Sequence, residues 1–171
     1  MRIESRYLIF YILLLICQLK PFTLQSQGEG FFNTADSVAG SIPAGVSRDI
    51  ETLSEYFLGR LSHKPDLIRA FYRWITGEIS YDVANMYTPP AISDPEKLIR
   101  ETLRSRKAVC QGYAELFHAL CRSAGIETYL VTGYTKQYGQ VMPLNHTWVV
   151  AGTDSGWYFT DPTWGDRKSV V

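Results

Sequence analysis

Cysteine is scarce in this chain, which has only Cys17, Cys110 and Cys121 among its 171 residues. So few cysteines exclude a disulfide-rich scaffold. Cys110 and Cys121 lie eleven residues apart on one predicted helix, which is about 16 Å at a rise of 1.5 Å per residue. A disulfide requires Cα atoms within about 7 Å of each other. These two thiols therefore cannot pair with each other.

Neither sign of charge is in excess, because 17 lysines and arginines balance 17 aspartates and glutamates. Nucleic-acid-binding proteins carry a basic surface that neutralises phosphates. This sequence has no basic face of that kind and no acidic tail. It therefore predicts no nucleic-acid partner.

Long apolar runs are also few. The run at residues 7–19 has 13 residues, whereas a membrane-spanning helix needs about 20. Two arginines precede the run and a Lys-Pro pair ends it. A basic head, a short apolar segment and a small-residue exit predict a secretory signal peptide over residues 1–26, cleaved after Ser26. A retained membrane anchor is the alternative. Cleavage would give a secreted, periplasmic or cell-surface protein without a stable membrane span.

The mature chain would contain 171 − 26 = 145 residues, the size of one domain. Only Cys110 and Cys121 would remain in it. An exported protein that keeps an unpaired thiol needs a reason, and a reactive nucleophile is one. Cys121 has helical spacing to Ala114 and Phe117, which predicts a small buried hydrophobic residue.

Residues 27–46 are rich in Gly, Ser, Ala and Pro, which predicts a flexible lead-in to a domain over residues 47–171. Apolar residues then recur at three- and four-residue steps, as in amphipathic helices. Residues 83–93 have no clear period and predict a loop that borders a cleft. The helices are expected within residues 47–61, 65–79, 94–103 and 110–124.

The pattern changes after Gly125 to β-branched and aromatic residues, which favour strands. Strands are expected at 127–134, 145–150 and 157–161, with a turn or loop at 136–143. Helices followed by antiparallel strands indicate an α+β domain.

Cys110 stands where a polar loop enters an apolar-striped helix. The first backbone N–H groups of a helix have no intrahelical partner and carry about +0.5 of an elementary charge. A thiol at this position is shifted toward thiolate, the nucleophilic form. A purely structural cysteine is the alternative.

His146 and Asp161 belong to two predicted strands joined by the short connection 151–156, so the strands should be antiparallel neighbours. If their polar side chains point to the same side, His146 and Asp161 meet near one end of this hairpin. That end could abut Cys110. Nucleophile, base and orienting carboxylate would then be together. The alternatives are a half-buried structural histidine and an aspartate that only starts a turn.

The chain resembles the core domain of the transglutaminase-like superfamily in three blocks, KAVCQGYAELFHALCRSAGIETYLVTGY, NHTWVV and GWYFTDPTW. It looks closest to the bacterial and kyphoscoliosis-peptidase-like branch, from about residue 50 to Trp164. The resemblance implies a papain-like α+β fold, with N-terminal helices and the nucleophile helix packed on an antiparallel sheet. It also implies thioester-forming acyl transfer on the peptide or amide bonds of a protein or peptide substrate. Cys110, His146 and Asp161 would be catalytic, with no metal and no organic cofactor.

Two departures concern the cysteine loop. Ala108 stands where the family usually has glycine, which would strain the loop if that position needs a positive φ. The N–H of Cys110 is a natural oxyanion donor, but the tryptophan that animal transglutaminases use as a donor has no counterpart before the cysteine. Secondary candidates for oxyanion or substrate contacts are Gln111, Tyr81, Tyr87 and Trp148.

A third departure is that the sequence ends seven residues after Trp164, where relatives usually continue with further strands. We therefore expect C-terminal strands to be missing. The sequence favours an exported cysteine-dependent enzyme, a protease or transglutaminase-like hydrolase, over a cross-linking enzyme. The alternatives are a non-catalytic binding module that retains the scaffold, or an inactive fragment.

Overall fold

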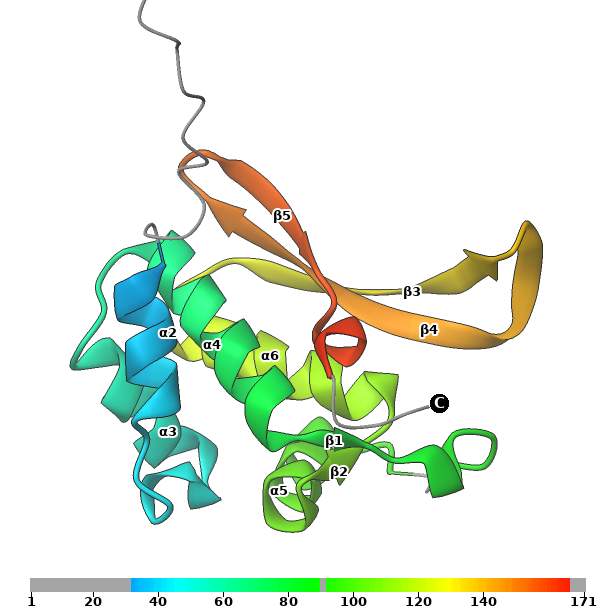
Figure 1. Cartoon of the computed structure of the whole chain (residues 1–171), viewed down its shortest axis with the longest axis horizontal. Coiled ribbons are helices and arrows are strands. Elements are labelled where there is room, and N and C mark those ends of the chain that lie inside the picture. Colours follow the sequence, from blue (N-terminus) through cyan, green and yellow to red (C-terminus); the bar gives the residue numbers. More distant parts are fainter. Residues whose placement is uncertain (1–31, 90–91, 167–171) are drawn as a thin grey trace, which may run out of the picture. The chain divides into compact units, whose positions relative to one another are not determined.

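Helices occupy the first part of the described chain and an antiparallel sheet the last part (Figure 1). The computed structural model describes residues 32–89 and 92–166. The α-helices are α2 (Asn33–Gly40), α3 (Ile50–Leu58), α4 (Lys64–Glu78), α5 (Pro95–Ser105) and α6 (Cys110–Ser123). The 3-10 turns are η1 (Val46–Arg48), η2 (Val83–Asn85) and η3 (Pro162–Gly165). The strands are β1 (Ser80–Tyr81), β2 (Lys107–Ala108), β3 (Thr128–Gln137), β4 (Gln140–Thr153) and β5 (Gly156–Thr160). The predicted α+β class is confirmed.

The main sheet has the order β3-β4-β5, with both pairs antiparallel. β3 and β4 continue to a tight turn at Tyr138 and Gly139, whose φ angles of 50° and 80° suit a two-residue hairpin. The predicted turn or loop at 136–143 is therefore confirmed only for a turn at 138–139, and the other residues belong to β3 and β4. Its glycine forms this turn, and Pro143 lies beside a register shift in the β3–β4 pairing, where a strand accommodates proline.

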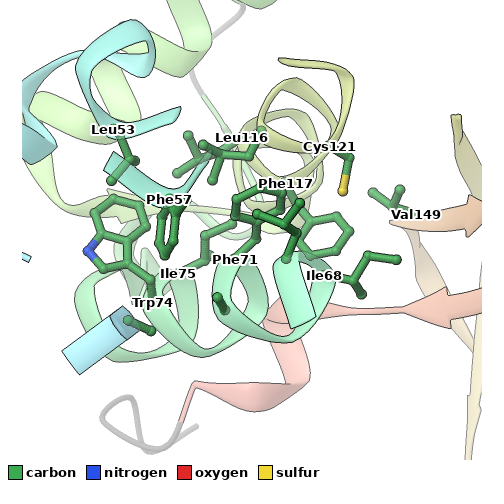
Figure 2. Packing of buried hydrophobic residues seen from close by; sticks show 14 of the residues in the cluster. Leu53, Phe57, Ile68, Phe71, Trp74, Ile75, Leu116, Phe117, Cys121 and Val149 are labelled. Atoms are coloured by element: carbon green, nitrogen blue, oxygen red, sulfur yellow. The ribbon is translucent and has the colours of Figure 1, made fainter. Parts of the chain in front are cut away.

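The core lies between α6, the helices α3 and α4, and strand β4. Figure 2 shows Leu53 and Phe57 of α3 and Phe71 and Ile75 of α4 facing Phe117 of α6. These five side chains are fully buried. Each buried side chain of this size stabilises the fold by about 2 kcal/mol relative to exposure. α6 is thus held along its length, which fixes the position of its first residue.

Residues 27–31 lie outside the described residues, but within residues 32–46 helix α2 contradicts the interpretation as a flexible lead-in. Ala35 and Ala39 are buried in the core cluster and lie four residues apart on one face of the helix. Arg69 of α4 donates to both carboxylate oxygens of Asp36 at 2.7 and 2.8 Å. The small alanines, which made the composition resemble a linker, are what allow α2 to pack closely.

The first helix of the predicted domain begins slightly later than expected. Asp49 is the N-cap of α3, and its side chain accepts from the Thr52 N–H at 2.8 Å. Ser47, where the expected helix range starts, lies in η1, and its hydroxyl accepts from the Arg106 guanidinium. The predicted signal peptide at residues 1–26 lies outside the described residues. Within residues 32–89 and 92–166, no helix is long and apolar enough to cross a membrane.

Candidate active site

Cys110 is the first residue of α6, directly after the extended residues of β2. β2 pairs with β1 in parallel, and the Asp82 N–H donates to the Ala108 carbonyl at 2.9 Å. Ala108 is buried, and positive φ among the described non-glycine residues occurs only at Arg106 and Tyr138. Ala108 therefore does not have a positive φ, and the backbone strain that such an angle would cause is absent.

Gly112 explains why the start of α6 can approach β2 and α5. A Cβ at this position would lie 2.7 Å from the Ala108 Cβ and 2.9 Å from the Thr102 hydroxyl oxygen. A larger residue would push the helix start away from both elements. The Cys-Gln-Gly segment therefore sets the position of the thiol as well as its chemistry.

The structure brings His146 and Asp161 together from neighbouring segments of the sheet. His146 lies in β4, and Asp161 follows the end of β5, where the chain turns into η3. His146 Nε2 lies 2.6 Å from Asp161 Oδ2, and the side chains are 13% and 24% exposed. The other carboxylate oxygen accepts from the Thr163 N–H at 3.1 Å. Asp161 thus caps a turn and also contacts the imidazole. It makes the turn contact of the structural alternative as well as the histidine contact expected of an orienting carboxylate.

Two tryptophans hold the His146 ring. Trp148 stacks on its face at a centroid distance of 6.0 Å, and Trp164 meets it edge-on at 6.0 Å. The Trp164 Nε1–H also points at His146 Nε2, at 3.1 Å, and competes there with the Asp161 contact. Because the carboxylate contact is shorter and charge-assisted, we assign the Nε2 hydrogen to the bond with Asp161. Nδ1 is then the nitrogen available to Cys110.

The short turn η3 is held in place by Asp166 and Gly165, two residues that the sequence analysis did not identify. Asp166 accepts from the Tyr81 N–H at 2.8 Å and from the Tyr113 hydroxyl at 3.3 Å. It therefore ties η3 to β1 and α6. Gly165 lies against α4, where an added Cβ would overlap Tyr72 and Thr76. The DPTW block was visible in the sequence, but these long-range contacts were not.

The thiol of Cys110 is more acidic than an ordinary cysteine. Burial opposes its ionisation, but a hydrogen bond with His146 and backbone hydrogen bonds from Thr147 and Gln111 outweigh burial and lower its pKa. In the other direction, hydrogen bonds to Asp161 and then Cys110 raise the pKa of His146 to about 9, against the effect of burial. These opposite shifts favour a thiolate–imidazolium pair at neutral pH.

Cys121 has the opposite environment, as predicted. It is fully buried in the core, and burial raises the pKa of its thiol far above the ordinary value. Both Cys110 and Cys121 are free thiols.

Cys110 and His146 line a cavity of about 660 Å³. Of the secondary candidates, Tyr81, Tyr87 and Gln111 also line it, whereas Trp148 lies behind the imidazole and is not among the lining residues. Burial, followed by the nearby Cys110 and Asp82, raises the pKa of Tyr81, so its hydroxyl stays protonated as a donor. Among the described residues, no three His, Cys, Asp or Glu side chains gather as metal ligands do.

A cysteine at the start of a central helix, beside a histidine and an aspartate from an antiparallel sheet, defines the papain-like class of folds. Residues 51–162 match the Transglutaminase-like superfamily core, and the chain belongs to this superfamily. The family prediction from the sequence is confirmed.

Relatives match only part of their own length. Kyphoscoliosis peptidase of Homo sapiens is 33% identical over 106 residues, which are 57% of this chain and 15% of that protein. Hillarin of Drosophila melanogaster is 26% identical over 150 residues, 81% of this chain and 17% of that protein. The periplasmic domain of TgpA from Pseudomonas aeruginosa, bound to ethylmercury, is a similar solved structure with a TM-score of 0.56. It is 22% identical, and the match covers 78% of this chain and 50% of that one. This chain thus spans less than a fifth of the curated relatives' length.

Proposed function

We propose that this protein is a cysteine-dependent acyl-transfer enzyme that acts on peptide or amide bonds. Cys110 is the nucleophile, His146 the general base and acid, and Asp161 the carboxylate that orients His146. The observation that carries the proposal is that His146, held by Asp161 at 2.6 Å, lines the same open cavity as Cys110, whose pKa it lowers. Membership of the transglutaminase-like superfamily supports it.

In the first half-reaction the Cys110 thiolate attacks the carbonyl carbon of the amide and forms a C–S bond. The negative charge moves to the carbonyl oxygen, toward which the Cys110 N–H and the Tyr81 hydroxyl are the donors we assign. The intermediate collapses, the C–N bond breaks, and the departing amine takes a proton from the imidazolium of His146. The product is a thioester on Cys110 and a neutral His146.

In the second half-reaction an acceptor attacks the thioester carbonyl and gives its proton to His146. The C–S bond breaks, and the thiolate–imidazolium pair is restored. We propose water as the acceptor, so that the net reaction is hydrolysis of a protein or peptide substrate. The rim of the cavity includes Tyr87 and Trp164, which are 72% and 61% exposed, so water reaches the site readily. We also propose export, on the evidence of the N-terminal apolar segment.

The assignment of the nucleophile is tested by labelling with a thiol-directed amide probe, followed by mass spectrometry of the intact protein. Cys110→Ala should abolish labelling, and the matched variant Cys121→Ala should not. Equal labelling of the two variants would defeat the assignment.

A pH titration of Cys110 alkylation separates the enzyme from a binding module that only retains the scaffold. The enzyme predicts an alkylation midpoint clearly below the unperturbed thiol value of about 8.5. The binding module predicts a midpoint near that value.

A further inference from the structure

The cavity contains an acidic side chain that acyl transfer does not use. Glu115 lies on α6, is 8% exposed and lines the cavity. Among the described residues, its carboxyl group has no hydrogen-bond or ion-pair partner. Burial raises its pKa. The Glu115 oxygens are not among the solvent-sealed polar atoms that lack a partner, so the carboxyl group faces the open cavity. A carboxyl group that is largely removed from water and has no protein partner favours a ligand that supplies a donor.

No neighbouring side chain supplies a positive charge to Glu115. His118, three residues further along α6, is bonded through Nδ1 to the Thr128 hydroxyl at 2.7 Å. Burial and then the nearby Arg122 lower the pKa of His118, which keeps it neutral. Of the described residues that line the cavity, none is a lysine or arginine, and Asp166 is a second acidic one. The positive charge of His146 is balanced by the Cys110 thiolate, so the remaining charged groups of the lining, Glu115 and Asp166, are complementary to a cation.

The lining of the cavity offers further hydrogen-bond acceptors. Gln111 lies one turn earlier on the same face of α6 and lines the cavity. Thr132 of β3 and Thr147 of β4 are paired in register, their hydroxyl oxygens 3.3 Å apart, and both also line it. A primary ammonium has three N–H donors and no acceptor. Leu130 adds an apolar wall that suits a methylene stem.

We propose that Gln111, Glu115, Leu130, Thr132 and Thr147 form a subsite that binds the primary ammonium of a lysine-like side chain on the acyl donor. This inference rests on the proposed function. Glu115 follows Cys110 by five residues, which is about 7.5 Å along the helix axis and about 140° around it. Both residues line the cavity, so an aminoalkyl chain would cross the cavity from the thiol to Glu115. The ammonium is a recognition group here and takes no part in bond formation.

The test uses irreversible substrate-like reagents that cannot serve as amine acceptors. A peptidyl chloromethyl ketone alkylates the thiolate with loss of chloride, and the reagents compared carry lysine or norleucine next to the ketone. The second-order rate of Cys110 alkylation should be at least about tenfold higher for the lysine reagent, as expected for a hydrogen-bonded charge. Glu115→Gln should bring this ratio close to one.

Two further variants make the result specific. Glu96→Gln removes the same charge from an exposed position on α5 and should keep the tenfold ratio. Thr132→Val removes one acceptor at an exposed strand position and should lower the ratio about threefold. A ratio near one in the wild type, or an unchanged ratio in Glu115→Gln and Thr132→Val, would overturn the proposal.

Iodoacetamide labelling of the same samples distinguishes this outcome from failure of the proposed function. If Cys110 reacts readily at neutral pH but shows no lysine preference, only the subsite is refuted. If Cys110 does not react at neutral pH, the acyl-transfer proposal fails as well.

Discussion

The two ends of α6 place the same side chain in opposite environments. At the start of the helix, Cys110 faces a cavity. Interactions of its sulfur with His146 and with backbone N–H groups lower the pKa of the thiol. Eleven residues later, Cys121 is enclosed by apolar side chains, among them Val149 (Figure 2), and burial raises its pKa. Burial opposes ionisation at both positions. What differs is the presence of donors to the thiolate, so hydrogen bonding rather than helix position alone decides reactivity.

The largest effect should come from removing the partner that distinguishes Cys110 from Cys121. In His146→Gln the hydrogen bonds of the imidazolium are lost while burial remains, so the pKa of Cys110 should rise. Iodoacetamide alkylation at pH 6 should fall at least about tenfold, since each pKa unit changes the thiolate fraction tenfold below the pKa. Amide turnover should fall about 10²–10⁴-fold. An unchanged pH profile of alkylation would mean that His146 does not support the thiolate.

A smaller effect is expected from Asp161→Asn, which keeps the shape but removes the charge. The hydrogen bond to Asp161 is the largest cause of the raised pKa of His146, so that pKa should fall from about 9 toward its ordinary value. The alkaline limb of the pH–rate profile should move to lower pH, with a loss of about 10²-fold at pH 8.

Asp161→Asn should also change how the stability of the fold depends on pH, because the pKa of His146 is raised in the folded state. The contribution of the protonated His146 to the free energy of unfolding is complete below the pKa that His146 has in the unfolded chain. It is lost as the pH rises through the folded-state pKa of about 9. The free energy of unfolding of the wild type should therefore decline more than that of Asp161→Asn between pH 6.5 and 9. Parallel pH dependences in chemical denaturation would contradict the assignment of the ion pair.

The smallest effect concerns the other end of the helix. Cys121→Ala removes a buried sulfur and leaves a small cavity, which should cost about 1 kcal/mol of unfolding free energy. The rate of Cys110 alkylation and its pH midpoint should stay as in the wild type. A shift of that midpoint would show that the two ends of α6 are coupled through packing.

Local patterns predicted much of this fold. The helix containing Cys110 and the strands after Gly125 follow clear periodicities, and the contrast between the two thiols was predicted from spacing alone. Residues 33–40 were missed because a helix with buried alanines has the composition of a linker, and only its packing on α4 stabilises it. The β3–β4 hairpin was underestimated because its turn glycine and Pro143 imitate a loop.

Some residues of the candidate site could likewise be predicted from the sequence, and others could not. Cys110, His146 and Asp161 were chosen by residue type, order and family resemblance. In the structure His146 Nε2 lies 2.6 Å from Asp161, and Cys110 and His146 line one cavity. Asp166 and Glu115 were missed, since one acts through contacts with residues more than fifty positions away and the other differs from a surface glutamate only by its burial. Sequence periodicity places Glu115 on the helix but does not reveal that it is buried in the wall of the cavity.

The carboxylate of Asp161 is shared between a backbone turn and an imidazole. One oxygen holds the Thr163 N–H and the other holds His146, so the rotamer of the carboxylate is already chosen before any substrate arrives. Unwinding η3 would release both contacts together. The orientation of the His146 ring thus depends on a short backbone turn that itself has no contact with the sulfur.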